Sequence, residues 1–539
     1  MPTAQVLFES SVSRAIVSSP VNSAWVSVLR ETYSPTFERV GVLYHVALRH
    51  FRSQKQRASL PGGQEFDAGS QREARQQALK VMEERKAAEK VDASQTEPAV
   101  FVDPHHTDES WPPCLVDPSV PPPPLHLLLG GRGRRPISGL AMMRAWLAAP
   151  LLHVTATAAG VQTLLHSNPV LAQLCGFKGY GISAGPGNLI SYGVPSAATL
   201  SEFNQVMTRY GLWRQASVLA VAENLRSGVV EVERGLSFDT AHIEADSGSV
   251  GLRVEGPKDK PTIKRICRLT KTCSCGKARW SMCPHPWRRT DDGAAVVVKG
   301  PTKKYWAHKM SVAAFAESEV PIDARVMQHA ADHDSTTVVP HLRELMKTFP
   351  GLLDALKYVL ADTAYHSKTV EVAELGPELH TAVRASTSKK PAAIAARLSG
   401  IDHFTRTGVP VCEAAVKFTM VGRDIPGERY IWTVPDNDDG YSPCESCRRA
   451  PSCGQGGARR YIRVDRNAFK QINWDNPQHL QSNRELYQHR TGVERAIKRL
   501  KVDLGAEHVT QRNALRVQAI VDTKMMTLHL LLRAQARAG

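Results

Sequence analysis

Residues 487–501 read YQHRTGVERAIKRLK, and four of them follow a helical spacing. Counted from Tyr487, the residues Arg490, Glu494 and Lys501 lie 3, 7 and 14 positions further on. At 3.6 residues per turn, a helix presents all four on one face. A carboxylate among an aromatic ring and two cations is expected where the carboxylate holds a metal ion and the cations hold phosphates. The alternative is an exposed amphipathic helix with fortuitous spacing.

Two more carboxylates follow short apolar runs. Leu236-Ser237-Phe238 leads into Asp239, and residues 358–361 lead into Asp362. Each run predicts a buried strand that delivers a carboxylate to the edge of a sheet. Phosphodiester cleavage by two divalent ions needs converging carboxylates, because Mg²⁺ prefers oxygen ligands and bridges the attacking and leaving oxygens. A lone Asp after such a run is more often a cap or turn residue, so the prediction depends on all three carboxylates.

These motifs resemble those of a known enzyme family. The spacing Tyr-x2-Arg-x3-Glu-x6-Lys is similar to the Y-R-E-K signature of one large branch of bacterial insertion-sequence transposases of the DDE class. Residues 238–242 and 360–367 resemble the first-Asp and second-Asp motifs of that branch, although Ala364 stands where glycine is usual. Residues 305–309 and 333–335 resemble its intervening strands, and residues 174–177 and 194–203 its N-terminal helical region. The resemblance covers roughly residues 137–532 and keeps the family's order along the chain.

The resemblance implies an α/β catalytic domain with an RNase H-like mixed sheet flanked by helices. Asp239 and Asp362 would lie on adjacent strands and Glu494 on a following helix. The three carboxylates would be catalytic and would bind Mg²⁺, with Mn²⁺ as a substitute. The implied function is cut-and-paste DNA transposition, in which transposon ends are cleaved and the 3′-hydroxyl is joined to target DNA by two-metal-ion phosphoryl transfer.

The same resemblance implies the DNA contacts and the partners. Tyr487 and Arg490 would position the DNA end and its phosphates, and Lys501 would contact the backbone. The partners would be double-stranded DNA, as terminal inverted repeats and target, and a second copy of the chain in a homodimer. Two other interpretations stay open: an inactive transposase-derived DNA-binding protein, and a zinc-stabilised nuclease without strand transfer.

Eight of the ten cysteines fall into two groups of four, one in each interval between the carboxylates. Clustered thiolates in a short, loop-rich segment are typical of structural zinc sites, and neither Cys₄ group would leave an open position for catalysis. The alternative is reduced, partly buried cysteines without metal. The first group is Cys267, Cys273, Cys275 and Cys283, and the second is Cys412, Cys444, Cys447 and Cys453.

The formal net charge of +16 indicates a polyanionic partner, most commonly nucleic acid. The excess is concentrated, because residues 257–304 hold 13 Lys and Arg against 3 Asp and Glu. The most apolar stretch, residues 140–165, is interrupted by Arg144, Pro150 and His153, and no signal peptide is visible. We therefore expect a cytoplasmic bacterial protein without a membrane span, associated with the nucleoid when bound to DNA.

Composition divides the chain into four predicted parts. Residues 1–90 form an N-terminal extension of unknown role with a charged helix at 71–90, and residues 91–136 form a Pro-rich linker. Residues 137–235 are predicted as a helical DNA-binding domain, with a purely structural helical cap as the alternative. Residues 236–532 are the predicted catalytic domain, with Cys-rich insertions at about 257–304 and 410–460.

Overall fold

The computed structural model describes residues 29–58, 137–245, 291–381, 398–465 and 476–538 with short gaps. It also describes short strands at 252–255 and 262–265 and isolated prolines at positions 112, 121 and 122. The predicted charged helix at 71–90, almost all of the Pro-rich linker and the first cysteine group lie outside the described residues.

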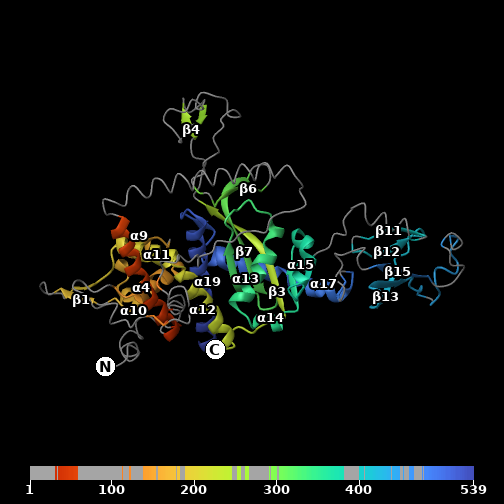
Figure 1. Cartoon of the computed structure of the whole chain (residues 1–539), viewed down its shortest axis with the longest axis horizontal. Coiled ribbons are helices and arrows are strands. Elements are labelled where there is room, and N and C mark those ends of the chain that lie inside the picture. The colour runs from red at the N-terminus through yellow and green to blue at the C-terminus, as the bar shows by residue number, and fades with distance from the viewer. Residues whose placement is uncertain are drawn as a thin grey trace.

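A mixed sheet forms the centre of the molecule (Figure 1). Strand β3 pairs in parallel with β9 on one side and antiparallel with β7 on the other. Strand β10 extends the sheet in parallel beyond β9, β16 pairs in parallel with the end of β3, and both β6 and β8 pair antiparallel with β7. The strands are β3 (Gly235–Ala245), β6 (Ala295–Lys299), β7 (Lys303–Phe315), β8 (Pro321–Val326), β9 (Tyr358–Ala361), β10 (Glu378–Thr381) and β16 (His508–Val509).

Helices cover the sheet on both faces. Successive side chains of a strand point to opposite faces. Phe238 of β3 contacts His341 of α13 (Val338–Thr348) with ring centroids 5.3 Å apart, so α13 covers its face. The next residue, Asp239, points to the other face, which α18 (Thr491–Lys498) covers. This mixed, helix-flanked sheet is the RNase H-like fold expected from the sequence.

The connections of the sheet contain shorter elements. They are η3 (Asp334–Thr336), α14 (Leu352–Ala355), η4 (Thr363–Lys368), α15 (Thr369–Ala373), α17 (Gln481–Gln488), the π-helical η6 (Arg499–Asp503) and the hairpin of β4 (Leu252–Glu255) and β5 (Thr262–Arg265). Residues 333–335, expected as part of a strand, instead contribute the N-cap His333 and the first two residues of the 3-10 turn η3. The His333 ring accepts the Ser335 N–H at 3.2 Å, and this cap stabilises the turn.

A helical module packs at one end of the sheet (Figure 1). Its helices share one apolar core, and α8 to α11 begin at side-chain caps such as Ser196, whose Oγ accepts the Thr199 N–H at 3.2 Å. The elements are α4 (Pro35–Ala58), α8 (Gly139–Leu151), α9 (Ala158–Ser167), α10 (Pro169–Cys175), α11 (Ala197–Arg209) and α12 (Leu212–Arg226), with the hairpin of β1 (Gly179–Ile182) and β2 (Leu189–Tyr192). No described helix is long and apolar enough to cross a membrane.

Helix α4 belongs to this core, although the sequence analysis placed it in the N-terminal extension. Phe37, Val40, Tyr44, Ala47 and Phe51 recur at helical spacing and are all buried in the core of the module. The 25-residue helix α19 (Ala514–Ala538) joins the two parts, because its residues contribute to the cores of both the module and the sheet.

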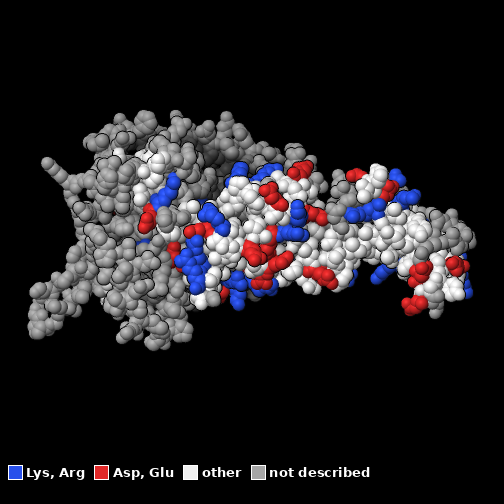
Figure 2. Space-filling view, turned by 90° about the horizontal axis from the view of Figure 1, so that it is seen from below, with Lys and Arg blue, Asp and Glu red and all other residues white. Residues whose placement is uncertain are grey.

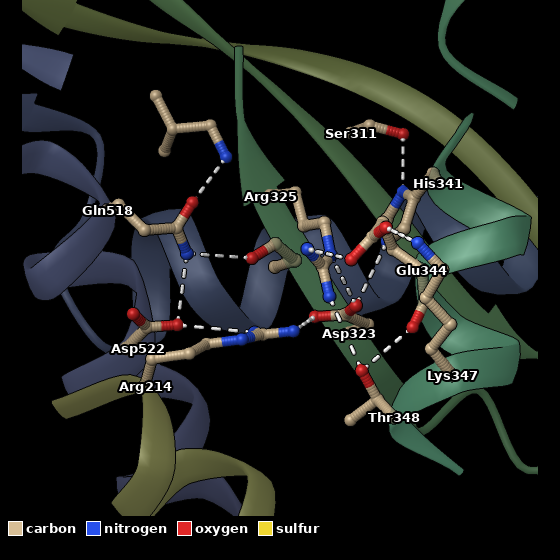
Figure 3. Close-up of polar contacts among 12 residues, drawn as sticks. Arg214, Ser311, Asp323, Arg325, His341, Glu344, Lys347, Thr348, Gln518 and Asp522 are labelled. Carbon is tan, nitrogen blue, oxygen red and sulfur yellow. Dashed lines mark hydrogen bonds and ion pairs between the residues drawn. The ribbon is translucent and has the colours of Figure 1, made fainter. Parts of the chain in front are cut away.

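A buried ionic network also connects the module to the sheet (Figure 3). Arg214 of α12 lies between two carboxylates, 2.6 Å from Asp323 of β8 and 3.3 Å from Asp522 of α19. Burial favours the neutral acid, but the guanidinium groups of Arg214 and Arg325 hold the pKa of Asp323 well below its usual range. Burial raises the pKa of Asp522 to about 6. Removing Arg214 would leave Asp522 buried without its ionic partner.

A small β module lies at the opposite end of the molecule from the helical module (Figure 1). It has its own apolar core, which includes the buried Tyr430 and Trp432. The strands are β11 (Ile401–Phe404), β12 (Pro410–Cys412), β13 (Thr419–Asp424), β14 (Arg429–Thr433) and β15 (Tyr461–Asp465). The second cysteine group lies in this module.

Candidate active site

The sheet register brings Asp239 and Asp362 together. Phe238 of β3 pairs with Ala361 of β9, and the two aspartates are the next residues on these parallel strands. Asp362 follows the end of β9, as predicted, whereas Asp239 lies inside β3, which continues to Ala245. The expectation that Asp239 ends a strand was wrong, because β7 and then β16 supply further pairing partners.

Both aspartates are oriented by the backbone that follows them. Asp239 Oδ1 accepts the N–H of Thr240 at 2.7 Å, and Asp362 Oδ1 accepts the N–H of Thr363. These bonds use one oxygen of each carboxylate and leave the second oxygen for another partner.

Glu494 reaches the same region from α18. The predicted continuous helix around it was wrong, because α17 ends at Gln488 and α18 begins at Thr491. Two anchors fix the break: the Ser237 hydroxyl donates to the His489 carbonyl at 3.3 Å, and the Tyr487 hydroxyl donates to the Ala361 carbonyl at 3.3 Å. The break therefore places Tyr487 directly beside the residue that precedes Asp362.

Arg490 connects two of the three carboxylates. Its Nη1 lies 3.6 Å from Asp239 Oδ2, and its Nη2 forms an ion pair with Glu494 Oε1. The Arg490 side chain is only 18% exposed, so its charge is poorly screened by water. Asp239 and Glu494 are thus held on the two sides of one guanidinium group.

The charges of the other two carboxylates affect the pKa of Asp239. Burial raises the pKa of Asp239 to about 6, and the neighbouring charges of Asp362 and Glu494 act in the same direction. The Thr240 N–H and the Arg490 guanidinium partly oppose this shift. Mutual repulsion of converging carboxylates is the condition that a bound cation relieves.

The comparisons with known proteins identify the domain. Residues 280–530 match the family model described as the transposase DDE domain. This part of the chain is a DDE-class transposase domain. A search of curated proteins gives no match. The family makes DNA the substrate of the transposase, and the matched range includes Asp362 and Glu494 but begins after Asp239.

The donor set of the transposase fits a hard divalent cation, since three carboxylates supply the oxygen ligands that Mg²⁺ prefers. As the side chains lie, no three His, Cys, Asp or Glu residues of the described chain form a group that could hold a metal ion. Arg490 supplies the positive charge between Asp239 and Glu494.

Sequence reasoning missed a polar chain beside Asp239 in the transposase. Lys309 of β7 lies 2.9 Å from Asp334 Oδ1, which also accepts the Thr240 hydroxyl at 2.9 Å. Burial favours the neutral acid, but Lys309 holds the pKa of Asp334 below its usual value. Lys309 and Asp334 both lie in motifs noted in the sequence. Their contact joins two separate elements, β7 and η3, and such a contact produces no periodic pattern in the sequence.

The remaining predicted DNA contact lies further along the chain. Lys501 is in the π-helical segment η6, and its ammonium group is 3.9 Å from Glu507 Oε1. On the face shown in Figure 2, Lys and Arg are interspersed with Asp and Glu over the described residues. Most of the strongly basic segment 257–304 lies outside the described residues.

The four cysteines of the second group form no disulfide bond in the described part of the chain. Cys412 and Cys444 pack against the apolar core of the β module, and Cys453 lies against the position where Gly400 would carry a side chain. Cys447 donates its backbone N–H to the Cys444 carbonyl at 3.4 Å in a turn. These cysteines belong to one small module, but no three of them form a metal-binding group in the described part of the chain.

Proposed function

We propose that this transposase cleaves transposon ends and joins the freed 3′-hydroxyl to target DNA. The observation that supports this most is that Arg490 contacts both Asp239 and Glu494, while the register of β3 and β9 sets Asp362 beside Asp239. The three carboxylates would hold Mg²⁺, or Mn²⁺ in its place. Bound divalent ions would supply an activated water and neutralise the charge that develops on the phosphate.

The residues around the carboxylates have separate roles in this proposal. Tyr487 fixes the backbone before Asp362 through its bond to Ala361. Arg490 lies between Asp239 and Glu494, and its guanidinium would contact a phosphate of the DNA end. Lys501 contacts the DNA backbone. The roles of Arg490 and Lys501 in DNA binding are those that the resemblance to the Y-R-E-K branch implies.

The proposal also covers the oligomeric state, the cellular location and the roles of the two smaller modules. Since two transposon ends must be cut together, the transposase acts as a homodimer on DNA. It works in the bacterial cytoplasm, at the nucleoid. The helical module binds DNA, and zinc stabilises the second cysteine group.

The test is a cleavage assay on duplexes that carry the ends of the element encoding this chain. Glu494→Gln should still bind DNA, but its cleavage should fall by about 10²–10³-fold or more, as expected when a group that stabilises developing charge is lost. Glu485→Gln is the matched control, because Glu485 is an exposed glutamate in the neighbouring helix α17.

The products decide between the interpretations. Cleavage and joining by the wild type with Mg²⁺ support the proposal. Cleavage without joining would identify a nuclease. Binding without cleavage by either protein, with Mg²⁺ or Mn²⁺, would identify a DNA-binding protein without turnover.

A further inference from the structure

Lys524 is a buried lysine that the proposed chemistry does not use. It lies in the middle of α19 and is only 4% exposed. It has no hydrogen bond or ion pair within the described part of the chain. The side chain as a whole is buried, but its ammonium nitrogen is not among the fully buried atoms that lack a hydrogen-bond partner, so it keeps some contact with solvent.

The Lys524 side chain lines a pocket at the junction of the helical module and the sheet domain. One wall comes from the connection between α8 and α9, through Val154 and Ala156. The other comes from the loop after η6, where Thr510 and Gln511 contribute a hydroxyl and an amide. The charge of Lys524 therefore faces an open space rather than packed apolar atoms.

The polar groups of this pocket suit an oxyanion. Thr510 and Gln511 make no side-chain hydrogen bond within the described residues, so their donors are available. Gly505, at the pocket wall, has φ +71° and no atom within 4 Å of the place of a Cβ, which keeps that wall open. His508, which also lines the pocket, has a partner elsewhere, because its Nδ1 lies 2.9 Å from Glu244 Oε2.

We propose that this pocket binds one phosphate group through Lys524, Thr510 and Gln511. An ammonium group with two neutral donors matches the charge and the hydrogen-bonding needs of a phosphate. Phosphate is favoured over other oxyanions because the family acts on DNA and the chain carries a net charge of +16. The phosphate comes from the DNA backbone or from solution. The pocket shares no residue with the carboxylate site, so it is independent of the catalytic proposal.

The titration of Lys524 agrees with this geometry. Burial lowers the pKa of Lys524 to about 8, and no other cause acts on it. The side chain is still mostly protonated at pH 7 and can bind an anion.

The first test is thermal unfolding of the full chain with inorganic phosphate at constant ionic strength. A ligand that binds only the folded protein raises its Tm. The wild type should show this rise, and Lys524→Met should lose it, with at least a tenfold weaker phosphate Kd. Lys347→Met is the control, because Lys347 is 74% exposed on α13, and it should respond like the wild type.

Without phosphate, Lys524→Met should have a Tm at least equal to that of the wild type, because it removes a partly desolvated charge. Thr510→Val provides a second variant at an exposed position, where folding is not at risk, and it should weaken phosphate binding in the same direction. The proposal is overturned if the wild type shows no phosphate effect, or if both variants respond as the wild type does.

DNA binding identifies the source of the phosphate. If the DNA backbone occupies the pocket, the slope of log K against log salt should fall by about 0.9 in Lys524→Met, the value for one lost phosphate contact. If the slope is unchanged while the effect of inorganic phosphate is lost, the pocket binds a free anion. The assay needs no cleavage, so it separates this proposal from the catalytic one.

Discussion

Arg490 Nη1 lies 3.6 Å from Asp239 Oδ2, although the two residues are 251 positions apart in the chain. The same guanidinium forms an ion pair with Glu494, one turn further along. A single arginine thus compensates two of the three carboxylates in the absence of another cation. The Arg490 guanidinium opposes the rise in the pKa of Asp239 that burial causes.

Arg490→Gln should reduce DNA cleavage by about 10²-fold or more, because a charge-assisted contact to the reacting phosphate is lost. The variant also leaves Asp239 and Glu494 without this positive charge, so the site should attract Mg²⁺ more strongly and half-maximal cleavage should need less Mg²⁺. Titrating Mg²⁺ at fixed DNA concentration measures both effects. Arg484→Gln, on an exposed residue of α17, is the control and should behave like the wild type. Unchanged cleavage by Arg490→Gln would remove this arginine from the mechanism.

Gly492→Ala should displace α18 and lower cleavage. A methyl group at this position would lie 3.1 Å from the Ala316 carbonyl oxygen, a backbone atom that cannot move alone. Alanine favours a helix by about 1 kcal/mol over glycine, whereas overpacking costs about 1–3 kcal/mol. We therefore expect a net loss of stability, measured by urea unfolding, together with reduced cleavage. A variant that is more stable and fully active would show that α18 has room to shift.

Much of the site could be predicted from local sequence, because the three carboxylates stand in short motifs. The sequence also correctly predicted a strand before Asp362 and a helix at Glu494. The position of Asp239 inside β3 was not predictable, since it depends on β7 and β16, which pair with β3 from elsewhere in the chain.

Long-range contacts also account for the other differences. The helix break at His489 depends on Ser237, 252 positions away in the chain. Helix α4 has a periodic apolar stripe, but the helices that it packs against, α8, α11 and α12, begin about 80 residues later in the chain or further on. The sequence therefore did not show that α4 belongs to the helical module. Lys524 stands in a strongly helical stretch, and only the tertiary structure shows that it is buried beside a pocket.

The purified transposase should contain zinc if the second cysteine group is a structural site. We expect Cys444→Ser and Cys447→Ser each to lower the zinc content by one ion per chain, measured by elemental analysis after dialysis. Loss of this ion should also destabilise the β module, because structural zinc contributes directly to folding. Cys175→Ala is the control, since Cys175 is buried in the helical module. Equal zinc content in all proteins would favour reduced cysteines without metal.

Arg214→Met should be among the most destabilising single changes in the described chain. It leaves Asp323 and Asp522 buried without their shared partner, and breaking a buried pair in this way costs about 3–5 kcal/mol. Urea unfolding should show this loss. Arg226→Met provides the matched control, because Arg226 is exposed at the end of the same helix. A loss below that of the control would mean that water solvates the two carboxylates.

Asp522→Asn tests the same network through pH. Burial raises the pKa of Asp522 to about 6, so the folded protein holds a proton there that the unfolded chain releases near pH 4. Stability from this group is therefore fully present below about pH 4 and is lost as the pH rises through 6. Asparagine cannot titrate, so the free energy of unfolding of the variant, relative to wild type, should increase between pH 4.5 and 7.5. The linkage estimate for this increase is on the order of 1–3 kcal/mol. Asp354→Asn, on an exposed residue, should show no such trend. A relative stability of Asp522→Asn that is constant with pH would mean that Arg214 keeps Asp522 ionised throughout this range.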